Sequence, residues 1–308
     1  MERSLEKEMM DLPANPKDLL EDDLRNLRAI NRYLGGYRGV LGGLARLIGE
    51  QKLDAFSLLD VGTGSGDIPV AIARWGRKRG VGIKIVALEP EPTIARVAAK
   101  LTQQRNPPGL PRSREKTRSW FDRLTTNGMA IWKLKYLAVR PEPVEGRAAV
   151  FSQLPLLQRG KEGDFRSHAI SVVRGDATML PFSALSFDFI LASQLLHHFS
   201  EEEIVTLLRI WSGVARKAIL VSDLVRHPVA YYGIRLLTRL ATRNAMTLTD
   251  APRSVQRAFT LPEWRELFSR AAIGPFEILP VFPFRMVAIF SVAGSISLPS
   301  SPSLEGED

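Results

Sequence analysis

The chain has 308 residues, of which 45% are hydrophobic, and it contains no cysteine. Without cysteine there are no disulfides, thiolate metal ligands or cysteine nucleophiles, and the length allows one or two domains with a sizeable core. The formal net charge of +9 raises the question of nucleic acid, but residues 104–168 carry thirteen Lys or Arg and six Asp or Glu, so the basic character belongs to that segment.

The first residues of the sequence and its apolar runs indicate the cellular location that we expect. Met1 to Glu6 lacks the basic and apolar regions of a secretion signal, and no run approaches the ~18 apolar residues of a membrane span. We expect a soluble, cytoplasmic protein. Residues 293–308 are rich in serine and proline and are predicted to be a disordered tail.

Residues 1–50 are predicted to form an N-terminal helical cap. From residue 15 onward leucines and an isoleucine recur at three- and four-residue spacing, which is typical of a helix with one apolar face. Gly35 and Gly36 interrupt this pattern before a second apolar stretch, Val40 to Ile48. The sequence therefore predicts two helices with a break at the glycine pair.

The most informative stretch runs from Leu58 to Asp67. Apolar residues lead to Asp60, glycines then alternate at Gly62, Gly64 and Gly66, and an apolar helical pattern follows from Ile68. This order predicts a buried strand, a tight turn and a helix start, where backbone N–H groups could contact a ligand. A carboxylate at Asp60 would repel a phosphate, so a ligand with an ammonium or sulfonium group is favoured.

A second strand, Ile83 to Leu88, ends at Glu89 and Pro90, and a helix is predicted over residues 92–101. Residues 104–168 then form an irregular basic insertion, since such connections usually need only ~2–6 residues. We expect this insertion to be disordered because it is rich in Pro, Gly, Arg and Ser and has no sustained period. With suitable codons, the reverse complement of residues 121–127 encodes six of the seven residues at 139–145. This favours a DNA inverted repeat read in frame, and an ordinary variable loop is the alternative.

The remaining elements alternate between strands and helices, which indicates a parallel sheet covered on both faces. The predicted strands are 170–174, 187–192, 218–222, 276–280 and 286–292, with helices at 201–214 and from Thr260 onward. The stretch Thr260-Leu261-Pro262-Glu263 predicts a helix start, with proline at the first position and glutamate in the first turn.

Three further sequence features indicate which nucleotide-type ligand the glycine turn favours. A dinucleotide fingerprint requires glycine three residues after Gly64, where Asp67 stands, although Glu89 suits either ligand. The third strand ends in Arg174-Gly175-Asp176-Ala177, followed by Met179-Leu180-Pro181-Phe182 and Ser186-Phe187-Asp188-Phe189-Ile190. With these motifs the chain resembles class I S-adenosylmethionine (SAM) dependent methyltransferases, in particular the small-molecule branch that contains the ubiquinone and menaquinone enzymes.

The resemblance covers residues 54–103 and 169–224, and it implies a fold, a cofactor and a site. The expected fold is α/β, a Rossmann-like seven-stranded, mostly parallel sheet with helices on both faces and an antiparallel C-terminal strand pair. The SAM-binding domain would comprise residues 51–103 and 169–292, with a helical lid at about 226–260. SAM would transfer its methyl group by SN2 displacement to a small-molecule acceptor.

The same resemblance implies roles for individual residues. Asp60, Gly62, Gly64 and Gly66 would line the methionine and ribose end of SAM. Glu89 would hold the ribose hydroxyls, and Pro90 would lie against the adenine. The remaining contacts, to the adenine edge and to the methionine portion, would come from Asp176, Ala177, Ser193 and Gln194. Asp60 and Asp176 could instead cap local structure, an alternative that the sequence leaves open.

His197 and His198 are the catalytic candidates, because they follow the fourth strand at the edge where ligands bind in open α/β sheets. A histidine with a pKa near ~6.5 could take a proton from an acceptor group. Adjacent histidines at a helix start are not expected to face one site together. No metal site is predicted, because the chain has four histidines in all and no His-Glu cluster with ligand spacing.

The helix predicted near 229–242 combines apolar residues at helical spacing with Arg235, Arg239 and Arg243. It is expected to be either a packed helix with a solvated basic face, or a lid or membrane-contacting surface beside a lipid acceptor.

Two other functions stay open: a nucleic-acid methyltransferase, and a non-catalytic SAM-fold protein impaired by the insertion. The first is disfavoured because the Asn/Asp-Pro-Pro-aromatic turn of base amino-methylation is replaced by Ser193-Gln194-Leu195-Leu196. The acceptor, the O-, N- or C-position of methylation and the oligomeric state are not indicated by the sequence.

Overall fold

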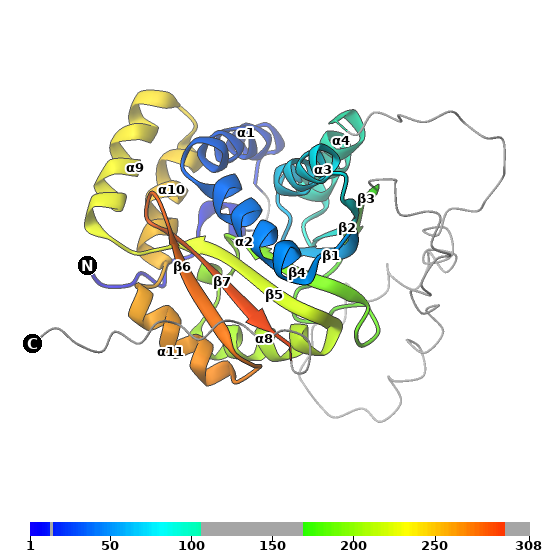
Figure 1. Cartoon of the computed structure of the whole chain (residues 1–308). Coiled ribbons are helices and arrows are strands. Elements are labelled where there is room, and N and C mark those ends of the chain that lie inside the picture. Colours follow the sequence, from blue (N-terminus) through cyan, green and yellow to red (C-terminus); the bar gives the residue numbers. More distant parts are fainter. Residues whose placement is uncertain (13–14, 106–168, 293–308) are drawn as a thin grey trace, which may run out of the picture.

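A computed structural model of the chain describes residues 1–12, 15–105 and 169–292 (Figure 1). The predicted insertion, apart from its first two residues, and the predicted tail lie outside these described residues. The strands are β1 (Ala55–Val61), β2 (Gly82–Glu89), β3 (Ala169–Arg174), β4 (Phe187–Ser193), β5 (Ala215–Leu224), β6 (Phe276–Val281) and β7 (Arg285–Ser291). The α-helices are α1 (Lys17–Tyr33), α2 (Gly36–Gln51), α3 (Asp67–Arg79), α4 (Pro92–Arg105), α8 (Glu201–Val214), α9 (Pro228–Ala241), α10 (Ala245–Arg257) and α11 (Leu261–Ala271), and short 3₁₀ helices are η1 (Met9–Asp11) and η3 (Leu196–His198).

The seven strands form one sheet in the order β3-β2-β1-β4-β5-β7-β6. Strands β1 to β5 are parallel, whereas β7 runs antiparallel to both β5 and β6. The predicted fold class is confirmed in strand number, direction and the antiparallel C-terminal pair. The order reverses between β1 and β4, and ligands bind at such a point in open α/β sheets.

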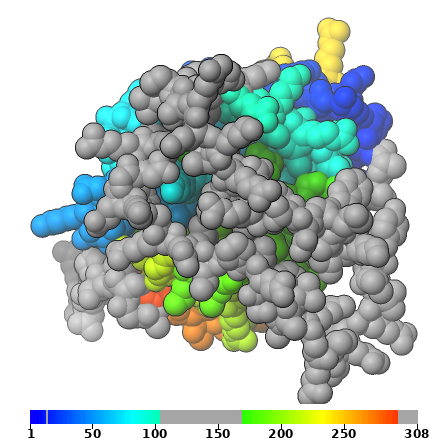
Figure 2. Space-filling model, turned by 90° about the vertical axis from the view of Figure 1, so that its right-hand side faces the viewer, coloured from blue at the N-terminus to red at the C-terminus, as the bar shows by residue number. Residues whose placement is uncertain are grey.

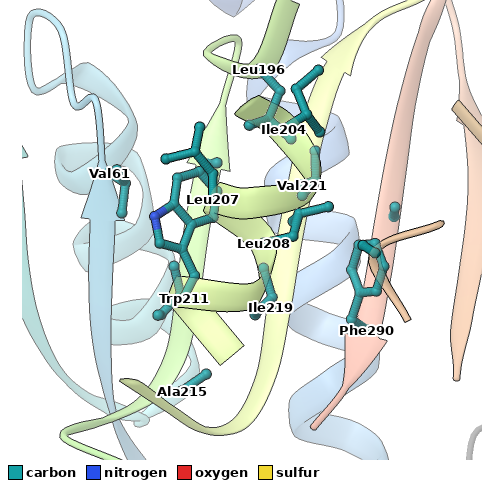
Figure 3. Close-up of a cluster of buried hydrophobic side chains, with 14 of the residues drawn as sticks. Val61, Leu196, Ile204, Leu207, Leu208, Trp211, Ala215, Ile219, Val221 and Phe290 are labelled. Atoms are coloured by element: carbon teal, nitrogen blue, oxygen red, sulfur yellow. The ribbon is translucent and has the colours of Figure 1, made fainter. Parts of the chain in front are cut away.

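Helices cover both faces of the sheet, as the alternating pattern predicted. On one face α2 and α3 bury apolar residues such as Leu44 and Ile72 against the strands. On the other face α8 and α11 pack Trp211 and Trp264 against β4, β5 and β7. Figure 3 shows Trp211 and Leu207 of α8 pointing toward Val61 of β1, so this core reaches the strand that carries the glycine turn.

Several helix boundaries follow signals present in the sequence. The α1–α2 break occurs at Gly35, which has a positive φ of 86° that glycine adopts without strain. Helix α11 begins with the predicted signal: Thr260 and Glu263 form a capping box, in which each side chain accepts a hydrogen bond from the other residue's backbone N–H. The helix predicted over 92–101 is longer than expected and ends at Arg105.

The N-terminal residues 1–12, which we call the strap, lie along α10. Ser4 donates its backbone N–H to the Gln256 carbonyl at 3.1 Å, and Asp250 accepts the backbone N–H groups of Met9 and Met10 at 2.8 and 3.0 Å. The strap is thus held by hydrogen bonds to a helix more than two hundred residues away in the sequence.

Strand β3 lies at one edge of the sheet, next to β2 and beside α4. Figure 2 views the molecule from this side, where residues of α3 and α4 (cyan) and the segment from β3 onward (green) are visible. The insertion therefore joins the described fold at a sheet edge. None of the helices in the described ranges is long and apolar enough to cross a membrane.

Candidate functional site

The glycine turn joins β1 to α3 as predicted. Gly62, Gly64 and Gly66 all have positive φ, at 68°, 55° and 76°. A Cβ on Gly62 would lie 2.7 Å from the Leu195 side chain, whereas a Cβ on Gly64 would meet nothing within 4 Å. The turn needs glycine for its backbone conformation at all three positions, and at Gly64 it also leaves open space beside the backbone.

Three carboxylates surround this turn. Asp60 is 1% exposed and accepts the Thr63 hydroxyl at 2.6 Å. Glu89, at the end of β2, is 6% exposed and accepts the backbone N–H of Gly64 at 3.0 Å and that of Glu91 at 3.2 Å. Asp67, the first residue of α3, accepts the Ser65 hydroxyl at 2.7 Å. The predicted site residues Asp60 and Glu89 are therefore brought together at the turn.

Burial makes these carboxyls hold protons more strongly than usual. It raises the pKa of Asp60 to about 7 against the hydrogen bond from Thr63, and the charges of Asp67 and Glu89 add to the rise. Burial likewise raises the pKa of Glu89 to about 7, opposed by the N–H groups of Glu91 and Gly64. A buried, electronegative site of this kind favours a ligand that carries positive charge.

The end of β4 forms the other wall of the site. Gln194 has a positive φ of 53°, and its backbone N–H donates to the Ser222 carbonyl at 2.7 Å. The Ser193 hydroxyl oxygen is buried and has no hydrogen-bond partner within the part of the chain that the structure describes. Such a group usually has a partner, so Ser193 is available to a bound molecule.

Asn31 of α1 closes the space between these two walls. Its amide nitrogen donates to Asp67 Oδ2 at 3.3 Å, and its amide oxygen accepts from the Gln194 side chain. Sequence reasoning missed Asn31, which is a polar residue on the buried side of an amphipathic helix. That placement was the available signal, because a buried amide needs polar partners.

The predicted adenine-side residues are less enclosed. Asp176 is exposed and accepts the backbone N–H and the hydroxyl of Thr178, both at 2.8 Å, so it caps its own turn in this structure. The Ala177 carbonyl accepts the Trp211 indole N–H at 3.0 Å, which anchors the turn on α8. The Gly175 backbone N–H donates to the Glu89 carbonyl at 3.3 Å, whereas Pro90 beside it is exposed.

The two histidines differ from the expectation. They lie in η3 rather than at the start of an α-helix, and both face Glu8 of the strap: His197 Nε2 is 3.6 Å and His198 Nε2 is 3.9 Å from Glu8 Oε1. The expectation that adjacent histidines cannot face one site is wrong here, because the tight 3₁₀ turn leaves their ring centroids 4.4 Å apart. Sequence reasoning missed Glu8, since nothing local pairs it with residues so distant in the chain.

His197 is held between two carboxylates. Burial alone would lower its pKa, but Asp223 at 2.7 Å and Glu8 raise the pKa to about 9. The pKa values of Glu8 and Asp223 lie below their usual range. Burial raises both pKa values, but the charges of the neighbouring histidines and the hydrogen bonds to them lower the values by more. In this arrangement His197 carries a proton at neutral pH and does not suit the role of a free base.

A cavity of about 670 Å³ lies beside the site, between α1, α2 and α3. Its wall includes Asp67, together with Arg32, Tyr37 and Trp75. Neither the three turn glycines nor the histidines line it, so it adjoins the predicted cofactor site without coinciding with it.

Comparison with known proteins agrees with this arrangement. Residues 152–218 match the family model described as a methyltransferase domain. The match begins within the predicted insertion and includes β3, β4, α8 and the start of β5, but it does not include the glycine turn. The methyltransferase prediction is confirmed at this level, while the quinone-type branch stays a prediction. No curated protein matches the chain.

Solved structures with a similar shape include three methyltransferases. They are an O-methyltransferase family 2 protein from Planctomyces limnophilus in complex with apigenin (14% identity, 91% of this chain, 62% of that chain, TM-score 0.49), human N-acetylserotonin methyltransferase in complex with SAM (14%, 92%, 61%, 0.48) and a SAM-dependent methyltransferase from Aquifex aeolicus (12%, 88%, 98%, 0.49). The chain spans less than two thirds of the first two proteins. At this identity and these TM-scores, the likenesses assign neither substrate nor site residues to this chain.

Proposed function

We propose that the protein is a SAM-dependent methyltransferase that acts on a small molecule. The observation that carries this proposal is the buried group of Asp60, Asp67 and Glu89 around a turn of three positive-φ glycines. A site with this charge suits a ligand with a sulfonium and an ammonium group, and it disfavours a pyrophosphate.

The residues at the turn fit such a ligand. Glu89 is placed to accept from ribose hydroxyls, because its carboxylate lies at the turn, where it accepts the backbone N–H of Gly64. Asp60, Gly62 and Gly66 would border the methionine portion, and the unpartnered Ser193 hydroxyl with Gln194 would meet it from β4. Asp176 and Ala177 would read the adenine edge once Asp176 exchanges its contact to Thr178.

SAM supplies an electrophilic methyl group on a sulfonium, which an acceptor lone pair attacks in line. The chain's contribution is to hold the acceptor close to that line and to exclude water, and such positioning supplies much of the rate. His198 stays a catalytic candidate, because η3 directly follows the β4 wall of the site, whereas His197 already carries a proton at neutral pH and does not suit the role of a base. His198, which is 17% exposed, is the more accessible of the two.

The acceptor that we propose is an apolar molecule delivered at a membrane surface. Helix α9 buries only Ile234 and Thr238, while its outer side exposes apolar residues, namely Val229, Tyr232, Leu236, Leu237 and Leu240. Arg235, Arg239 and Arg243 on the same segment are exposed too. An apolar face flanked by arginines suits the surface of an anionic bilayer.

Sedimentation with vesicles tests this contact. We expect binding to vesicles rich in phosphatidylserine and weak binding to phosphatidylcholine vesicles, and Leu236→Ser with Leu240→Ser should abolish it. Glu201→Gln, on α8, is the control because its side chain pairs with Arg270 away from α9. Equal retention of the double variant on anionic vesicles would refute the membrane surface.

Calorimetric titration of the full chain with SAM tests the cofactor. We expect one site, weakened at least ~10-fold by Glu89→Gln because a charge-assisted hydrogen bond is lost. Glu50→Gln, a surface residue paired with Arg46, should bind SAM as the native chain does. No detectable binding to the native chain would refute the proposal.

A screen with labelled SAM separates the acceptor classes. Transfer is expected to phenols, quinol precursors or polyketide-like compounds. Transfer to DNA or RNA alone would instead support the nucleic-acid alternative. SAM binding without transfer to either class would favour a non-catalytic SAM-fold protein.

A further inference from the structure

Three side chains that can ligate a metal meet beneath the strap. Glu8 contributes a carboxylate oxygen, and His197 and His198 contribute ring nitrogens, all within 4.8 Å of one another. Glu8 and His197 are each 2% exposed, so the group is enclosed by protein. Nothing in the sequence spacing joins Glu8 to the histidines, which is why the prediction of no metal site did not include it.

Both imidazoles are oriented by a second carboxylate. His197 Nδ1 lies 2.7 Å from Asp223 Oδ1, and His198 Nδ1 lies 3.0 Å from Asp11 Oδ2. When each Nδ1–H donates to its carboxylate, the Nε2 lone pair is left facing Glu8. Histidines that bind metals in proteins usually have this partner on the other ring nitrogen, because it fixes the tautomer and the ring direction.

The backbone around the group is fixed as well. The Arg257 guanidinium donates to the carbonyls of His197 and His198 at 3.2 and 2.7 Å and to that of Glu6 at 2.5 Å. One side chain therefore holds both the histidine turn and the strap. Asp223 also accepts the backbone N–H groups of Leu196 and His197, at 3.0 and 3.3 Å.

We propose that Glu8, His197 and His198 form a binding site for a divalent transition metal ion of the zinc type. With metal–ligand bonds of 2.0–2.1 Å, tetrahedral ligands lie roughly 3.4 Å apart. The separations of 3.6 and 3.9 Å from Glu8 Oε1 to the two Nε2 atoms need only small shifts to reach that value. Two imidazoles and one carboxylate are a ligand set that Zn²⁺ accepts with a fourth position for water or another ligand.

The alternative to a bound metal ion is a proton that His197 and Glu8 share. A bound proton and a bound metal ion exclude each other at His197 Nε2, because the same lone pair serves both. A metal ion would also tie the strap to the core, since Glu8 is the single ligand that comes from residues 1–12. Both consequences can be measured without SAM or acceptor, so the outcome is independent of the proposed methyl transfer.

The experiment uses the full chain after removal of metals with a chelator. Titration with Zn²⁺ should show about one ion per chain. Co²⁺ should give the visible absorption of a low-coordinate nitrogen and oxygen site. Glu8→Gln and His198→Gln are each expected to weaken binding at least ~10-fold, and Asp11→Asn to weaken it less, because Asp11 acts through His198.

Glu6→Gln and His227→Gln are matched controls. Glu6 is an exposed carboxylate of the same strap, and the His227 side chain caps α9. Circular dichroism and thermal unfolding of every variant separate lost ligation from lost folding. Hydrogen exchange at residues 4–12 should slow when Zn²⁺ is added to the native chain.

The proposal is overturned if the native chain binds no Zn²⁺ at micromolar concentrations, which would assign the space to the shared proton. It is also overturned if Zn²⁺ binds as tightly to Glu8→Gln and His198→Gln as to the native chain, which would place the ion elsewhere on the surface.

Discussion

The carboxyl groups of Asp60 and Glu89 are buried, and no positively charged side chain is among the groups that shift their pKa values. Such groups are costly to ionise, and a cationic ligand would relieve that cost. Residues of this kind lower the stability of the ligand-free protein in exchange for affinity.

The pH dependence of stability should reveal this cost. A carboxyl whose pKa is raised from 3.8 to about 7 contributes stability that is present below pH 3.8 and is lost as the pH rises to about 7. Asp60→Asn removes that contribution. Relative to the native chain without ligand, its free energy of unfolding should rise by on the order of a few kcal/mol between about pH 4 and about pH 8, while its SAM affinity falls.

Urea unfolding across this range provides the measurement. Asp188→Asn is the matched control, because Asp188 lies on the adjacent strand and binds Ser57 and Arg216 instead of the site. An unchanged pH slope in Asp60→Asn would mean that Asp60 does not hold its proton in the folded state.

Gly62 and Gly64 form a second matched pair. Both have positive φ, so alanine at either position costs about 1–3 kcal/mol of backbone strain. Gly62→Ala also drives its Cβ to 2.7 Å from Leu195, whereas the Gly64 Cβ enters open space. Gly62→Ala should therefore unfold at lower urea than Gly64→Ala, while Gly64→Ala loses SAM affinity with the smaller loss of stability. Equal stability of the two variants would contradict the contact with Leu195.

At the scale of elements, the strap and α10 act as one unit. Asp250 holds the backbone of Met9 and Met10, so Asp250→Ala should release the strap without disturbing the sheet. Hydrogen exchange at residues 4–12 should become faster by at least ~10-fold, because two hydrogen bonds to a charged group are lost. Glu202→Gln, an exposed residue of α8, should leave exchange unchanged. Unaltered protection in Asp250→Ala would show that other contacts hold the strap.

Local signals predicted the elements well, but contacts between distant elements were not predictable. The glycine pair before α2 and the Thr260 cap each act within a few residues, so the chain's own periodicity and turn chemistry exposed them. Glu8 and Asn31 reach the site only through the packing of the strap and α1 on the rest of the molecule. For the same reason the sequence did not show whether the apolar side of α9 is exposed or packed against the rest of the protein.

At the scale of the whole molecule, the site is assembled from two halves that the insertion separates. The parallel pairing of β2 with β3 runs from Lys84 opposite Ala169 to Glu89 opposite Arg174, and it uses residues outside 106–168. Because β3 is an edge strand, a short connection from α4 can reach it along the side of the sheet.

Replacing residues 106–168 with a short Gly-Ser linker should therefore preserve the fold and leave SAM affinity within ~3-fold, since loop-closure entropy changes slowly with length. Circular dichroism and calorimetry provide the measurement. Tight binding that is gained only after the replacement would instead identify the insertion as damaging.

The overall architecture and the cofactor class were predictable because they rest on motifs near strand ends, Asp60 to Gly66, Glu89 and Asp176. The acceptor was not predictable, because the residues near α9 carry no recognisable substrate motif. The described part of the family match, from Ala169 to residue 218, belongs to the half of the sheet that follows the insertion.

Asn31 connects α1 to both halves at once, through Asp67 at the glycine turn and Gln194 after β4. A molecule that passes between these walls would have to break both side-chain hydrogen bonds. The lifetime of a bound product would then depend on how often these two hydrogen bonds open. Where this opening is slower than methyl transfer, release of the product limits turnover, and Asn31→Ala is expected to accelerate dissociation of the product more than it weakens its binding.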